Sequence, residues 1–149
     1  MINKIQRFQK ILTTREKIRD EERLFLSEAR NHEDRVLLCV KGLQQQKQEA
    51  LSIFEDQEGQ VFSPQDMWYR RKAIDVIEEE IHQANEALQK VRESICQSEE
   101  RLVEKHKEVR IMEKYVGKLR YQYREFLLLA EQEELDDIAS VRHVEKMGE

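Results

Sequence analysis

Residues 67–130 read MWYRRKAIDVIEEEIHQANEALQKVRESICQSEERLVEKHKEVRIMEKYVGKLRYQYREFLLLA. Apolar residues recur in this stretch at alternating steps of three and four. The positions in phase are Met67, Arg70, Ile74, Ile77, Ile81, Ala84, Leu88, Val91, Ile95, Ser98, Leu102, Lys105, Val109, Met112, Val116, Leu119, Tyr123, Phe126 and Ala130. Such a repeat, held this long, imposes a left-handed supercoil and requires a partner helix. The stretch is therefore predicted to form one long helix of a coiled coil.

A break in the pattern precedes this helix, at residues 56–64, DQEGQVFSP. It contains the single proline of the chain and one of its four glycines. Ser63 is a good N-cap, Pro64 suits the first helical position, and Asp66 roughly completes a capping box. We therefore expect one domain over residues 1–149, with a helix at about 3–56, a turn at about 57–63, a helix at about 64–141 and a tail at 142–149.

The first helix has a weaker apolar stripe. Its members are Phe8, Ile11, Ile18, Phe25, Ala29, Val36, Cys39, Leu43, Ala50 and Ile53, with Leu12, Leu26, Val40 and Phe54 on an adjacent edge. A short turn makes the two helices run antiparallel. The predicted fold is all-α, an elongated antiparallel two-stranded coiled-coil hairpin.

Composition excludes several other classes. Charged residues make up 38% of the chain, and four glycines and one proline are too few for the turns of a sheet fold. The net charge of −5, with intermixed signs, disfavours a nucleic-acid binder. No run of 18 apolar residues exists, so direct membrane insertion is not expected. Cys39 and Cys96 make no disulfide framework, and a cytoplasmic location is the default expectation.

The two helices differ in length, and the difference leaves an overhang. A first helix folded back from the turn reaches only about residue 117, so residues 118 to about 141 project roughly 35 Å beyond it. This overhanging C-terminal helix carries Tyr123, Phe126 and Leu127 among many apolar residues, with basic residues before them and acidic residues after them. An apolar surplus of this kind indicates a partner-binding surface or packing against another copy of the chain. The pattern alone leaves both open.

No catalytic or cofactor site is expected. The four histidines lie far apart, and the spacing of Glu78 and His82 suits a metal only if further ligands are present. The glycines are isolated, so no phosphate loop exists, and a two-helix fold encloses no substrate cavity. We therefore expect no enzyme activity, no cofactor, no metal and no small-molecule substrate.

Three segments resemble the FliJ family, the stalk proteins of the bacterial flagellar type III export apparatus. They are residues 7–12 (RFQKIL) with 15–17 (REK), residues 63–67 (SPQDM), and residues 134–139 (ELDDIA) with Arg142. The resemblance implies an antiparallel coiled coil similar to the shaft of rotary ATPases. It also implies a role in flagellum biogenesis and protein export, hence in motility and chemotaxis.

The resemblance further implies three partners: the hexameric export ATPase, the cytoplasmic domain of the membrane export gate, and export chaperones. Peripheral location at the cytoplasmic face of the membrane would follow. The ATPase-facing residues would be Phe8, Leu12, Arg15, Glu16, Leu135, Asp136, Asp137 and Ile138, together with the overhang residues Tyr123, Phe126 and Leu127. The gate-facing residues would be Met67, Trp68, Ala73, Ile77 and Ile81. Arg70 and Ala73 depart from the family, which tends to have aromatic residues at these spacings.

Two alternatives stay open at this point. One is the related YscO-type stalk of virulence secretion systems. The other is a self-associating structural coiled coil, for instance a parallel dimer of extended chains.

Overall fold

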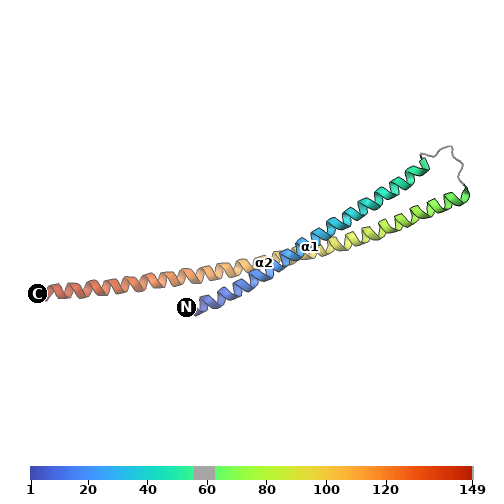
Figure 1. Cartoon of the computed structure of the whole chain (residues 1–149). Coiled ribbons are helices and arrows are strands. Elements are labelled where there is room, and N and C mark those ends of the chain that lie inside the picture. Colours follow the sequence, from blue (N-terminus) through green and yellow to red (C-terminus); the bar gives the residue numbers. More distant parts are fainter. Residues whose placement is uncertain (56–62, 149) are drawn as a thin grey trace. The chain divides into compact units, whose positions relative to one another are not determined.

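The protein is built from two long helices. The computed structural model describes residues 1–55 and 63–148. Helix α1 spans Ile2–Glu55 and helix α2 spans Pro64–Met147, and the described residues include no strand (Figure 1). The two helices pack against each other in antiparallel directions. The predicted all-α helical hairpin is therefore confirmed.

The start of α2 follows the predicted capping pattern. The Asp66 backbone N–H donates to Ser63 Oγ at 3.1 Å, and the Met67 N–H donates to the Ser63 carbonyl at 3.2 Å. Pro64 is the first helical residue. Apart from Ser63, the predicted turn lies outside the described residues.

Helix α2 ends later than expected. It continues to Met147, past the predicted end near residue 141. No proline or glycine follows Gly117 until Gly148, whose N–H donates to the Val144 carbonyl at 3.0 Å. Residues 142–147 are therefore a continuation of the helix.

Tertiary contacts divide the chain into two units. The terminal unit comprises Met1–Asp20 and Val103–Glu149, and the middle unit comprises Glu21–Leu102. Each unit pairs a part of α1 with a part of α2. The expectation of one domain over residues 1–149 stays a prediction.

Ion pairs join the two helices within the middle unit. Glu22 pairs with Arg101 at 3.4 Å, Arg30 with Glu99 at 3.2 Å, and Lys47 with Glu78 at 3.4 Å. From the first pair to the last, the residue number of the α1 partner increases while that of the α2 partner decreases. The two helices therefore run antiparallel. Pairs in contact with solvent, as these are, contribute at most about 1 kcal/mol each, so apolar burial provides most of the stability.

The core of the terminal unit is a small apolar cluster. Leu12 of α1 packs with Val109, Met112 and Val116 of α2, and Phe8 packs against this cluster. Val109 has no exposed surface. The beginning of α1 is therefore fixed against α2 by side chains that repeat every three or four residues.

The predicted seam of α2 is confirmed over most of its length. All sixteen in-phase positions from Arg70 to Tyr123 are buried or half-buried. Met67, Phe126 and Ala130, the first and the last two positions in phase, are exposed. Ser98 is completely buried, so the seam is closely packed at this polar position.

The predicted stripe of α1 was partly wrong. Ile11, Ile18, Phe25, Cys39 and Ile53 are exposed, whereas the edge formed by Leu12, Leu26, Val40 and Phe54 is buried or half-buried. The buried or half-buried positions in phase are Ile5, Phe8, Leu12, Arg15, Arg19, Glu22, Leu26, Ala29, Glu33, Val36, Val40, Leu43, Lys47, Ala50 and Phe54. One third of this seam is charged, and long charged side chains can lay their aliphatic stems along apolar surface.

Candidate partner-binding surfaces

The C-terminal part of α2 has no covering helix within the terminal unit. In Figure 1 the N-terminal end of α1 lies beside α2, and α2 continues past it. Every residue from 124 to 148 is exposed, whereas Leu119 is 6% exposed and Tyr123 is half-buried. The pairing thus ends near Tyr123, about six residues later than the sequence predicted. We call residues 124–148 the uncovered segment.

The uncovered segment is unusually apolar for an exposed helix. Phe126 is 60% exposed and Leu129 is 63% exposed. Other large apolar side chains in the segment are also exposed, namely Leu127, Leu128, Leu135, Ile138, Val141, Val144 and Met147. Contiguous apolar exposure of this extent is typical of a protein–protein interaction site.

A groove lies where the pairing ends. Its lining consists of Ile2, Ile5, Gln6, Arg120, Tyr123, Arg124 and Leu127, and its volume is about 330 Å³. Arg120 Nη2 donates to Gln9 Oε1 at 2.6 Å, which holds the guanidinium against α1. The groove therefore combines an apolar floor with two arginines and continues directly into the uncovered segment.

Charge is divided along this part of α2. Lys114, Lys118, Arg120 and Arg124 precede the apolar run, and all four are exposed. An acidic cluster follows it and is also exposed, comprising Glu131, Glu133, Glu134, Asp136 and Asp137. A partner that covers the whole surface therefore needs a basic region opposite the acidic cluster.

The structure separates the predicted ATPase-facing residues into two groups. Leu12 is 6% exposed and belongs to the apolar cluster, and Phe8, Arg15 and Glu16 are half-buried. Tyr123 is half-buried at the groove. The remaining predicted residues, Phe126, Leu127, Leu135, Asp136, Asp137 and Ile138, are exposed on the uncovered segment. Only this second group has side chains largely available to a partner.

The predicted gate-facing residues lie near the start of α2 in the middle unit. Met67, Trp68 and Ala73 are exposed, and Ile77 and Ile81 are half-buried. The Trp68 ring meets the Tyr69 ring edge-on with centroids 5.1 Å apart, and Lys72 Nζ lies 5.5 Å from the Trp68 centroid. This pair of aromatic residues, 56% and 62% exposed, suits the recognition of another protein.

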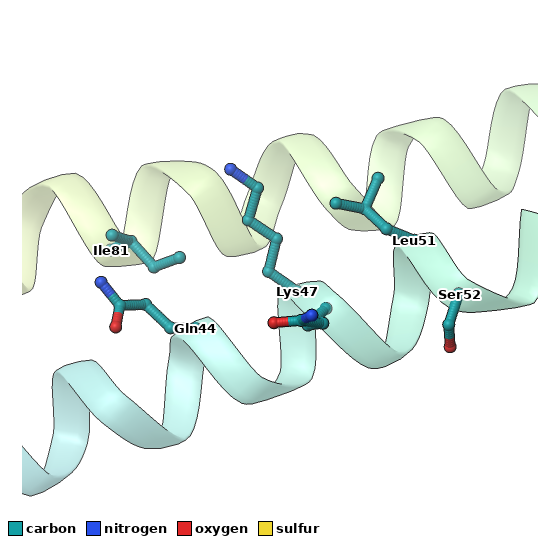
Figure 2. Close-up of a pocket in the computed structure, with 6 residues that line it drawn as sticks. Gln44, Lys47, Leu51, Ser52 and Ile81 are labelled. Atoms are coloured by element: carbon teal, nitrogen blue, oxygen red, sulfur yellow. The ribbon is translucent and has the colours of Figure 1, made fainter. Parts of the chain in front are cut away.

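Two shallow grooves accompany this surface. One has a volume of about 470 Å³, and Met67 and Ile74 of α2 line it with Leu51 and Phe54 of α1. The other, of about 370 Å³, is shown in Figure 2, where Lys47 and Leu51 of α1 extend toward α2, Ile81 faces Gln44, and Ser52 points away. Ile81 is therefore partly occupied by contacts within the chain.

Sequence reasoning missed two residues of these surfaces. Ile2 and Ile5 line the groove at the start of α1. Ile5 lies three residues before Phe8, so extending the seam backwards from Phe8 would have found it. Trp68 and Tyr69 were expected from the sequence either as recognition anchors or as contacts that close the turn, and both side chains are exposed.

Metal binding and membrane crossing concern residues 1–55 and 63–148, the part of the chain that the structure describes. No group of three or more His, Cys, Asp or Glu side chains lies close enough together to hold a metal ion in this part of the chain. His82 Nε2 pairs with Glu86 Oε1 at 3.1 Å. Neither of the two described helices combines the length and apolar content that a membrane crossing requires.

Comparison with known proteins gives one match. The model of the FliJ family, described as the flagellar FliJ protein, matches residues 3–148. No curated protein and no solved structure matches the chain significantly. Because the family model covers nearly the whole chain, this protein belongs to the FliJ family and is a component of the flagellar protein export apparatus.

Proposed function

We propose that the uncovered segment docks the protein into the ring of the flagellar export ATPase. The observation that carries this proposal is the exposure of every residue from 124 to 148 on a helix rich in large apolar side chains. Covering one such side chain is worth about 1.5–3 kcal/mol. A partner that covers several of them therefore gains enough free energy for stable binding, even after the cost of association.

The ring form of the ATPase is the preferred partner in this account. A helix with exposed side chains on all its faces can contact several subunits of a ring at once. A ligand that binds the assembled ring better than free subunits shifts the equilibrium toward the ring by mass action. The protein therefore promotes assembly of the hexamer and, through it, ATP hydrolysis.

The start of α2 supplies a second binding surface in this proposal. Met67, Trp68 and Ala73 contact the cytoplasmic domain of the export gate, with Ile77 and Ile81 at the edge of the contact. The exposed pair Trp68 and Tyr69 acts as the aromatic anchor. A protein bound by one surface to the ATPase and by the other to the gate couples ATP turnover to delivery of substrates by export chaperones.

The experiment mixes the protein with a flagellar export ATPase and measures hydrolysis rate and the fraction of assembled ring. Phe126→Ser and Leu135→Ser, both at exposed positions, should each reduce the apparent affinity by about tenfold without unfolding the protein. Val76→Ser is the matched control, because Val76 is 56% exposed but lies in the middle unit. Equal stimulation by all three variants would overturn the proposal.

A further inference from the structure

One face of α2 carries an ordered sequence of charges. Arg120, Arg124, Leu127, Glu131, Glu134 and Ile138 follow one another at alternating steps of four and three, so they share a face of the helix. All six are exposed, Leu127 at 44% and Ile138 at 45%. We call this set the charged stripe.

The charged stripe is complementary to itself. Two basic residues lie before Leu127 and two acidic residues lie after it, at matching distances along the helix. Arg120 and Glu134 are each seven residues from Leu127, and Arg124 and Glu131 are three and four residues from it. Two copies of the stripe running antiparallel therefore place every arginine beside an acidic residue and Leu127 beside Leu127.

The groove at the start of α1 extends the same face. Arg120, Arg124 and Leu127 line it together with Ile2 and Ile5 of α1, and its volume is about 330 Å³. In the antiparallel arrangement, Ile138 of a second copy lies alongside the part of α2 that α1 also covers. The residues of the second copy that lie opposite the groove are Leu127, Glu131 and Glu134, which face Leu127, Arg124 and Arg120.

We propose that a second copy of this chain covers the charged stripe, giving an antiparallel dimer with its two-fold axis at Leu127. The interface is isologous, so each contact occurs twice. The dimer covers part of the uncovered segment, which the ATPase ring also requires, and the two associations are therefore mutually exclusive. This last consequence rests on the proposed function, whereas the dimer itself does not.

Sedimentation equilibrium of the full chain over a range of concentrations tests the dimer. Each charge reversal alters two pairs, so Arg124→Glu and Glu131→Arg should each weaken dimerisation about tenfold or more. The double variant Arg124→Glu/Glu131→Arg restores opposite charges and should recover most of the lost affinity. Lys118→Glu is the control, since Lys118 is exposed but lies about 180° around the helix from Leu127.

A cross-linking experiment locates the two-fold axis. In a Cys39→Ser/Cys96→Ser background, Leu127→Cys should form an intermolecular disulfide with oxidised glutathione. Leu129→Cys should not, because two residues turn the side chain about 200° around the helix. A chain that stays monomeric at all concentrations overturns the inference. A dimer whose affinity is unchanged by the charge reversals also overturns it, and so does a dimer that forms the disulfide equally well from Leu127→Cys and from Leu129→Cys.

Binding to the export ATPase, measured on the same samples, keeps the two proposals separate. A monomer that binds and stimulates the ATPase contradicts the dimer and leaves the proposed function intact. A dimer that meets the charge-reversal test but never binds the ATPase contradicts the proposed function alone. If both are correct, raising the concentration of the full chain should lower the fraction of it that is available to the ring.

Discussion

The ring of Phe8 meets the ring of Tyr115 edge-on, with centroids 4.8 Å apart and an interplanar angle of 74°. This contact joins the second turn of α1 to α2 within the terminal unit. Gln9, the next residue, accepts the hydrogen bond from Arg120. The two contacts fix the position along α2 at which α1 begins, and hence the point from which α2 is uncovered.

Truncation of Phe8 should weaken this end of the helix pair. Because Phe8 is half-buried, Phe8→Ala should lower the free energy of unfolding by about 1.5–3 kcal/mol, less than a fully buried Phe→Ala change. Urea unfolding followed by circular dichroism measures the loss. Phe25→Ala, at a position 52% exposed, is the control and should cost clearly less.

Ser98 is expected to be a site where a substitution stabilises the protein. Its side chain is completely buried, and no hydrogen-bond partner for its Oγ is found among the described residues. Ser98→Ala removes an unsatisfied hydroxyl and should raise the free energy of unfolding by about 1–2 kcal/mol. A decrease in the urea midpoint would mean that the hydroxyl has a stabilising partner.

Gly117 offers a second stabilising substitution. A Cβ atom at this position would have no atom within 4 Å, and the residue is exposed within α2. Gly117→Ala should therefore stabilise the protein by about 1 kcal/mol through helix propensity alone. Thermal unfolding should show a higher midpoint, and an unchanged or lower midpoint would contradict the uninterrupted helix at this residue.

The cap at the start of α2 can be tested by removing its hydroxyl. Ser63→Ala loses the bond from the Asp66 N–H and should cost about 1 kcal/mol. The loss should be local, so hydrogen exchange should accelerate in the first turn of α2 and stay unchanged around Val109. Uniform acceleration along α2 would indicate that the cap stabilises much more than the first turn.

The seam of α2 was predictable because its apolar residues follow one phase from Arg70 to Tyr123. The seam of α1 was not, since Arg15, Arg19, Glu22, Glu33 and Lys47 occupy positions in phase. A search for apolar residues therefore selects exposed neighbours such as Ile11 and Ile18. Long charged side chains bury their aliphatic stems at these positions, so the buried face of α1 does not coincide with its apolar residues.

The sequence predicted the kind of site, an uncovered apolar helix end, but not the residue at which it begins. The sequence indicated an uncovered apolar end of α2, and the structure contains one, but it starts after Tyr123 and not after Gly117. This difference comes from the register of the two helices, which the contacts of Phe8 and Gln9 define and which composition cannot supply. Leu12 was predicted as a partner contact from resemblance, yet its side chain is buried in the chain's own core.

The uncovered segment is the central feature of this account, and a truncated chain tests it most directly. A protein ending at Tyr123 keeps the paired parts of both units and should stay helical, with the fold of the helix pair unchanged. In a titration of a flagellar export ATPase, the full chain should increase hydrolysis and ring formation, and the truncated chain should do neither. Equal stimulation by the two proteins, at matched helicity, would contradict the assignment of residues 124–148 as the docking segment.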